Sequence, residues 1–208
     1  MHSSVATSPP HEHPATLLAS VSDLGDLRVG LRLARPSDAP RVRAFLERLS
    51  PETRRRRFGT PQPQISASLV RHFTFPDPRQ RMIVVATAPL EGTERIVGLA
   101  DAAFLRSGLA EIAFVVADEL QGRGIGHLLA AAAAALAARR GARLKADISG
   151  GGVPALGVMR GLGPTVSTWE DGSSVAYATL PAPAEDDGRD AVGPFGSFAE
   201  RFGGRRGA

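Results

Sequence analysis

The sequence predicts a domain of the α/β class, more closely α+β, with a mixed, mostly antiparallel, twisted sheet of about six or seven strands flanked by helices. Two observations lead to this prediction. Short apolar runs separated by glycine- and proline-containing turns occupy the middle and the end of the 208-residue chain, as strands do. A glycine-rich loop, Gln121 to Gly126, connects one of these runs to a long alanine-rich segment that is typical of a helix.

The first half of the domain is predicted to be mainly helical after one strand. Ser37 or Asp38 is expected to cap the first helix, because their side chains can accept hydrogen bonds from its free amides. Ser50 and Pro51 start a second helix, since proline suits the first helical position. The predicted elements are a strand at 27–33, a helix reaching Leu49, a short helix from Pro51 and a helical piece at 65–73.

The second half carries most of the predicted sheet. A three-stranded meander is expected first, because its β-rich runs are separated only by short turns. The meander leads into the glycine loop and the alanine-rich helix, which ends at Gly141. The predicted elements are strands at 82–88, 95–105 and 109–117, a helix at 124–140, a strand at 143–148, a helix at 155–160, and strands at 165–169 and 174–180.

The domain is expected to span residues 27–180, between two tails. Residues 1–26 and 181–208 mix proline, glycine, serine and charged residues without a period, so both segments are predicted to be flexible. His2, His11 and His13 have no second cluster of ligands elsewhere in the chain, so no metal site is expected.

The composition excludes several classes of function. The chain has no cysteine, which excludes disulfides, thiolate–metal sites and covalent cysteine catalysis. No apolar run approaches about 18 residues and no signal-peptide pattern opens the chain, so a cytoplasmic protein without a membrane partner is expected. The net charge is only +4, Lys145 is the only lysine, and aromatic residues are few, so no nucleic-acid partner is expected.

The loop from Gln121 to Gly126 is predicted to bind a diphosphate. Glycines in this loop carry no side chains, so backbone N–H groups can close around an anion at the start of the helix. No Lys-Ser/Thr pair follows the glycines, and their spacing is not G-x-G-x-x-G, so neither a P-loop nor a dinucleotide motif explains them. The structural alternative is that these glycines serve a tight turn and close helix packing.

The pattern Gln121-x-x-Gly124-x-Gly126, between an apolar strand and a helix, resembles the acetyl-CoA-binding motif of the GCN5-related N-acetyltransferase (GNAT) family. The resemblance covers about residues 28–180. Three segments are more narrowly similar to the acetyltransferase domain of bacterial protein lysine acetyltransferases. These segments are Leu49-Ser50-Pro51-Glu52-Thr53, Ile96-Val97-Gly98-Leu99-Ala100 and Ala110-Glu111-Ile112-Ala113.

This resemblance implies which residues bind the co-substrate acetyl-CoA. The backbone amides of the loop would hold the pyrophosphate, with Arg123 adding charge. The preceding strand would pair its backbone with the pantetheine arm where neighbouring strands splay apart, and a β-bulge is expected there. The implied binding residues are Phe114, Val115, Val116, Gln121, Gly122, Arg123, Gly124, Ile125 and Gly126.

Glu111 is the predicted general base, because it occupies the Ala-Glu-x-Ala position of the resemblance. Acetyl transfer needs a neutral amine, and a lysine with a pKa near 10.4 is neutral only about once in a few thousand molecules at pH 7. Partial desolvation in an otherwise apolar strand is expected to prepare Glu111 to accept a proton through water. The alternative is a strand-edge glutamate in solvent.

The expected function is an N-acetyltransferase that moves an acetyl group from acetyl-CoA directly to a primary amine in a ternary complex, without a metal. A protein lysine is the favoured acceptor. Two alternatives stay open: a small-molecule amine as the acceptor, and a non-catalytic regulatory module that binds acyl-CoA. A monomer and a homodimer are both compatible with the sequence.

Overall fold

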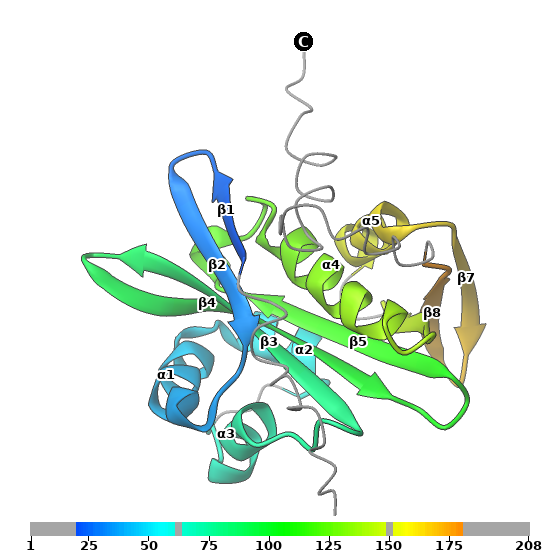
Figure 1. Cartoon of the computed structure of the whole chain (residues 1–208), viewed down its shortest axis with the longest axis horizontal. Coiled ribbons are helices and arrows are strands. Elements are labelled where there is room, and N and C mark those ends of the chain that lie inside the picture. The colour runs from blue at the N-terminus through cyan, green and yellow to red at the C-terminus, as the bar shows by residue number, and fades with distance from the viewer. Residues whose placement is uncertain (1–19, 61–63, 149–151, 181–208) are drawn as a thin grey trace, which may run out of the picture.

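The computed structural model describes residues 20–60, 64–148 and 152–180, which form an eight-stranded sheet with helices on both faces (Figure 1). The strand order is β1-β2-β3-β4-β5-β6-β8-β7, and all neighbours are antiparallel except β5 and β6. The predicted fold class is therefore confirmed, with one strand more than the upper estimate. The strands are β1 (Ser20–Leu24), β2 (Leu27–Leu33), β3 (Arg81–Leu90), β4 (Thr93–Phe104), β5 (Leu109–Val116), β6 (Arg143–Asp147), β7 (Thr165–Glu170) and β8 (Ser173–Ala178).

The helices fall into two groups on the two faces of the sheet. α4 packs on β3, β4 and β5 with α5 beside it, while α1, α2 and α3 cover the opposite face (Figure 1). None of the described helices is both long enough and apolar enough to cross a bilayer. The helices are α1 (Ala39–Arg48), α2 (Pro51–Phe58), α3 (Ala67–Thr74), α4 (Ile125–Ala138) and α5 (Gly152–Leu162), with 3-10 turns at Pro36–Asp38 and Asp118–Leu120.

β1 corrects the predicted N-terminal tail. The prediction of a flexible tail over residues 1–26 is wrong for Ser20–Leu24, because this strand pairs with β2, with Ser20 opposite Leu31. Its sequence, SVSDL, holds too few apolar residues to predict a strand by itself, so the pairing with β2 defines it. The remaining tail residues, 1–19 and 181–208, lie outside the described residues.

Local capping chemistry explains where the first helices begin. Ser50 caps α2 as predicted, because its Oγ accepts a hydrogen bond from the Thr53 amide at 3.1 Å. Asp38 holds the N-cap position of α1, but its carboxylate turns backward. It accepts hydrogen bonds from the Arg35 amide at 2.8 Å and from both terminal nitrogens of Arg32 at 2.7 Å. Asp38 therefore fixes β2 to α1 instead of capping the helix.

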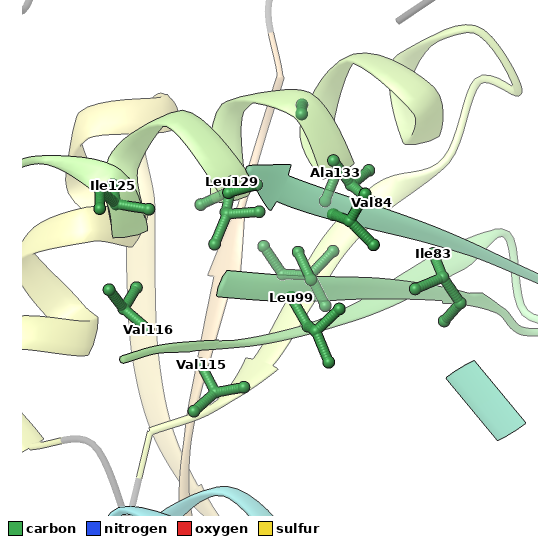
Figure 2. Close-up of a cluster of buried hydrophobic side chains, with 14 of the residues drawn as sticks. Ile83, Val84, Leu99, Val115, Val116, Ile125, Leu129 and Ala133 are labelled. Atoms are coloured by element: carbon green, nitrogen blue, oxygen red, sulfur yellow. The ribbon is translucent and has the colours of Figure 1, made fainter. Parts of the chain in front are cut away.

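α4 lies close to the sheet because small residues line the contact. A Cβ atom at Gly98 of β4 would come within 2.7 Å of the Leu129 side chain and 3.5 Å of Ile125. Figure 2 shows Ile125, Leu129 and Ala133 on the side of α4 that faces the strands. Alanines fill most of the remaining helix positions, so the backbone of α4 approaches the strands directly. This close approach places the N-terminus of α4 at the end of β5.

Candidate active site

β5 is paired on both sides only over its first residues. Toward β4 it is antiparallel through Val116, which lies opposite Gly98. Toward β6 the parallel register ends at Glu111, which lies opposite Lys145. The predicted splaying of the strands is therefore confirmed, and β5 has an edge beyond Glu111 that β6 does not cover.

The β-bulge predicted within the segment Phe114–Val116 is wrong. The register between β4 and β5 continues without a shift. The irregularity lies between β3 and β4, where Ala86 pairs with Gly98 but Thr87 pairs with Ile96. The departure of β6 frees the edge of β5, so no extra residue in β5 is needed.

The loop after β5 enters α4 through two glycines with left-handed backbone. The φ angle is 76° at Gly122 and 93° at Gly124, a region that residues with a Cβ rarely adopt. Gly124 is the N-cap of α4, and the His127 amide donates to its carbonyl at 3.0 Å. The amides just before His127 lie at the positive end of the helix dipole, where a helix offers them no acceptor. This geometry suits an anion, and binding of one stays a prediction.

The apolar residues implied in acetyl-CoA binding offer their backbone, because their side chains pack in the protein. Ile125 is fully buried beneath α4. Phe114 and Val116 face the same helix, since a Cβ at Gly126 would meet them at 3.3 and 3.9 Å. Val115 is buried on the opposite face of the strand (Figure 2). The peptide groups of this segment therefore form the open edge that a ligand would contact.

Gln121 and Asp118 tie α2 to this loop, a connection that the sequence analysis did not predict. The Gln121 side-chain amide donates to Val116 O at 3.2 Å and to Thr53 Oγ1 at 3.3 Å. Asp118 accepts hydrogen bonds from Ser50 N at 2.9 Å, Ser50 Oγ at 2.7 Å and Thr53 Oγ1 at 2.6 Å. Burial raises the pKa of the Asp118 carboxyl, but these donors outweigh burial and hold the pKa below its usual value. Gln121 thus holds the loop to the end of β5 and to α2.

Replacing Asp118 with alanine is expected to lower the free energy of unfolding by about 1–2 kcal/mol, because three hydrogen bonds to a carboxylate are lost at a partly exposed site. Acetyl-CoA should bind several-fold more weakly, since α2 no longer supports the loop. Chemical denaturation and calorimetry measure the two effects. The matched control is Glu119→Ala at the exposed neighbouring position. Equal behaviour of the two variants would contradict the supporting role of Asp118.

Arg123 points toward the turn between β1 and β2. Its guanidinium forms an ion pair with Asp26 on that turn. Leu24 lies close to the same loop, 3.5 Å from the position of a Cβ at Gly124. Burial lowers the pKa of His127 in the first turn of α4 and so favours its neutral form. The charge that Arg123 was expected to add to a bound pyrophosphate stays a prediction.

Glu111 lies in an open cavity of about 720 Å³ on the face of the sheet that carries α1, α2 and α3. Ala103 of β4 lies directly opposite Glu111, and Ala113 follows two residues later on the same face. The Glu111 side chain is exposed, so the predicted partial desolvation of its carboxylate is wrong. The neighbours on β4 and along β5 are these small alanines, while Lys145 of β6 lies opposite Glu111 on its other side, with its Nζ 3.7 Å from Glu170. Glu111 is therefore accessible to an acceptor that enters this cavity.

Asp101 forms a buried charge cluster in the same cavity, and the sequence analysis missed it. Asp101 is 5% exposed, and Arg57, Arg81 and His72 all converge on its Oδ2. The distances are 2.8 Å from Arg57, 3.0 Å from Arg81 and 3.7 Å from His72, the last too long for a hydrogen bond. Burial raises the pKa of the Asp101 carboxyl, but His72, Arg57 and Arg81 outweigh burial and hold the pKa below its usual value.

The last two strands add a smaller polar network next to Glu111. Tyr177 of β8 pairs with Lys145 of β6, and its hydroxyl donates to Glu170 at 2.8 Å. Lys145 Nζ lies 3.7 Å from the same carboxylate. Glu170 is therefore engaged by two partners. Trp169 beside it is 71% exposed, so it is not a core residue of the hairpin.

Comparison with known proteins agrees with this geometry. Residues 43–163, more than half of the chain, match the model of the acetyltransferase (GNAT) family. The chain belongs to this family. Acetyltransferase PA5475 from Pseudomonas aeruginosa is 37% identical to the chain over 111 residues. This match covers 52% of the present chain and 60% of the relative, so a large part of the relative has no counterpart in the alignment.

Two solved structures show the same GNAT fold. The GNAT domain of S. lividans PAT has a TM-score of 0.69 and 28% identity, and the match covers 81% of this chain and 100% of that domain. A phosphinothricin acetyltransferase from Sinorhizobium meliloti, solved in complex with AcCoA, has a TM-score of 0.55 and 19% identity, covering 73% of this chain and 88% of its own. The latter likeness shows the fold alone. The chain therefore has the family and the fold of the GNAT acetyltransferases.

Proposed function

We propose that this GNAT chain uses acetyl-CoA to acetylate a primary amine, with a protein lysine as the favoured acceptor. The observation that carries the proposal is the continuity between the N-terminus of α4 and the open edge of β5 beyond Glu111. Acetyl-CoA has a diphosphate followed by an extended arm that contains amides. The helix N-terminus would bind the diphosphate, and the adjacent strand edge would bind the arm. The S. meliloti structure with AcCoA supports the co-substrate. The similarity to the S. lividans PAT domain, with the sequence resemblance to protein lysine acetyltransferases, favours a lysine acceptor.

The loop supplies binding through several weak contacts. A charge at a helix N-terminus gains only about 0.3–1 kcal/mol at an exposed site, so useful affinity requires several amides acting together. The peptide groups of Phe114–Val116 along the open β5 edge would add hydrogen bonds to the arm. Both sets of contacts belong to the backbone, so glycine at position 124 is expected to matter more for binding than any polar side chain in the loop.

Glu111 is assigned the role of general base. An acceptor amine that enters the cavity would lose a proton to Glu111 through a bridging water, at a cost that is otherwise about 4–5 kcal/mol at pH 7 for a lysine. The neutral nitrogen then attacks the thioester carbonyl, the new C–N bond forms, and the C–S bond breaks. The nitrogen then gives up its extra proton, which the departing thiolate takes up to leave as the thiol of coenzyme A. The thiolate is an acceptable leaving group because thiols have pKa values near 8.5.

Gly124→Ala is expected to weaken acetyl-CoA binding at least about tenfold. The substitution places a Cβ at a φ of 93°, which strains the turn that aims the amides. The control is Gly92→Ala in the β3–β4 turn, where φ is 74° and a Cβ would meet open space. Both variants carry similar backbone strain, so calorimetry with acetyl-CoA isolates the effect on the loop. Equal affinities would contradict the assignment of the loop.

The acceptor is identified by incubating the protein with acetyl-CoA and a cell extract and locating new acetyl groups by mass spectrometry. Polyamines, aminoglycosides and amino acids are then added as competitors. A protein lysine acceptor predicts acetylated lysines that these small amines do not suppress. Acetylation of small amines in preference to proteins would support the alternative acceptor class, and acetyl-CoA binding without any turnover would support a non-catalytic module.

A further inference from the structure

On the face of the sheet that carries α1, α2 and α3, three side chains form an in-register row along the acceptor cavity. Arg81 of β3 lies opposite Ala103 of β4, and Ala103 lies opposite Glu111 of β5. Residues opposite one another in a sheet share a face, and all three line the cavity. Arg81 and Glu111 are two strands apart, on the order of 10 Å between their backbones. The small side chain of Ala103 leaves the space between them open.

The two ends of this row carry opposite charge. Arg81 and Arg57 share the single carboxylate of Asp101, so two guanidinium groups face one buried anion and leave an excess of positive charge. Arg57 is held against the rings of Phe58 and Phe73, and its buried Nε has no hydrogen-bond partner among the described residues. The Arg81 side chain is 31% exposed and the Arg57 side chain 14%, so Arg81 is the more accessible of the two guanidinium groups. Glu111 supplies negative charge at the other end.

We infer that the acceptor carries a carboxylate as well as its amine, and that Arg81, supported by Arg57, holds the carboxylate while the amine lies at Glu111. This inference rests on the proposed function and names its substrate class. The cavity volume of about 720 Å³ is within the range of small-ligand sites, so it accommodates an amino acid or a lysine side chain with an acidic neighbour. Guanidinium groups bind carboxylates through charge-assisted hydrogen bonds, which gives the preference its physical basis.

Matched acceptor pairs test the inference. Peptides with a lysine next to glutamate are compared with the same peptides carrying glutamine, and ω-amino acids are compared with their amides. The carboxylate member of each pair is expected to have at least about tenfold higher kcat/KM in the unmodified protein. Preference only among peptides assigns the carboxylate to an acidic residue of a protein substrate, and preference only among amino acids assigns it to a small molecule. Equal kcat/KM within both pairs would overturn the inference.

Arg81→Gln is expected to remove this preference by raising KM for the carboxylate acceptors while leaving KM for acetyl-CoA and for the amide acceptors unchanged. Arg79→Gln, at an exposed position outside the cavity lining, is the matched control. If Arg81→Gln lowers kcat/KM equally for carboxylate and amide acceptors, Arg81 has a structural role and the inference is overturned. If Arg81→Gln does not fold, Ala103→Leu replaces it, because a larger side chain should block the passage and abolish the preference without weakening acetyl-CoA binding.

Failure of the proposed function is distinguishable from failure of this inference. Turnover of amines without a carboxylate preference contradicts the inference alone. If no amine is acetylated, the proposed function fails, and calorimetry with the same acceptor pairs at saturating coenzyme A decides the inference. Binding of the carboxylate member that depends on Arg81 supports it, and equal or undetectable binding of both members overturns it.

Discussion

Glu111→Gln is expected to lower the rate of acetyl transfer at pH 7 by about 100-fold or more, the usual contribution of a positioned general base. The substitution keeps the shape of an exposed side chain and removes its ability to accept a proton. Acetyl-CoA binding should be unchanged, because the side chain faces the acceptor cavity on the α1–α3 face. Release of coenzyme A measures the rate, and calorimetry measures the binding.

The pH dependence of this variant separates a base from a residue that merely shapes the cavity. A lysine amine deprotonates by itself as the pH approaches 10.4, so the need for a base falls. The rate deficit of Glu111→Gln should therefore shrink between pH 7 and pH 9. Glu91→Gln, at an exposed site in the β3–β4 turn, is the control for removing one negative charge. A deficit that stays constant with pH, or a loss of acetyl-CoA affinity, would contradict the role of Glu111.

Local signals in the sequence predicted the parts of the site that depend on short segments. Ser50 followed by Pro51 is a cap that needs no distant partner, and the structure confirms it. The glycines at 122 and 124 have the left-handed backbone that glycine adopts readily in a turn. The end of pairing between β5 and β6 also followed from the family resemblance. The cap at Ser50 and the two glycines are each fixed by residues within a few positions of one another, whereas the end of β5–β6 pairing joins segments far apart in the chain.

Features that depend on distant partners were not predicted. Ser50 and Asp118 meet only because α2 packs on the end of β5, and neither local sequence predicts this contact. The partners of Asp101 come from α2, α3 and β3, far away along the chain. The sequence does hold one signal for this cluster. Asp101 lies within the apolar β4 run, and a carboxylate that is buried with such a run needs a positively charged partner. The sequence does not say which cations are its partners.

The β-bulge that was expected in β5 shows a second reason why the sequence does not predict every feature of the site. A freed strand edge arises either from an extra residue in the strand or from the departure of its neighbour, and both fit the same sequence. In this chain β6 leaves β5 after Lys145 and continues to pair with β8 through Asp147. The strand partners, which are tertiary information, decided between the two.

Asp101→Asn is expected to lower the free energy of unfolding at pH 7 by about 3 kcal/mol, because removing the charge of a buried carboxylate leaves Arg57 and Arg81 without compensation. The estimate is at the low end for buried ion pairs, since Arg81 keeps some contact with water. Denaturation by urea measures the change. Asp23→Asn, at an exposed position in β1, is the control and should cost less than about 0.5 kcal/mol.

The same variant has a defined pH dependence. The folded protein holds the pKa of Asp101 below its usual value, while the unfolded chain has a pKa near 3.9. The unfolded state therefore binds the proton first as the pH falls, so the stabilisation by Asp101 is fully present above about pH 5 and is lost as the pH falls below about 4 toward the folded pKa. The stability difference between the unmodified protein and Asp101→Asn should be constant from pH 5 to 8 and shrink below pH 4. A difference that grows on acidification would show that the carboxylate is protonated more readily in the folded state, which would contradict its pairing with the two arginines.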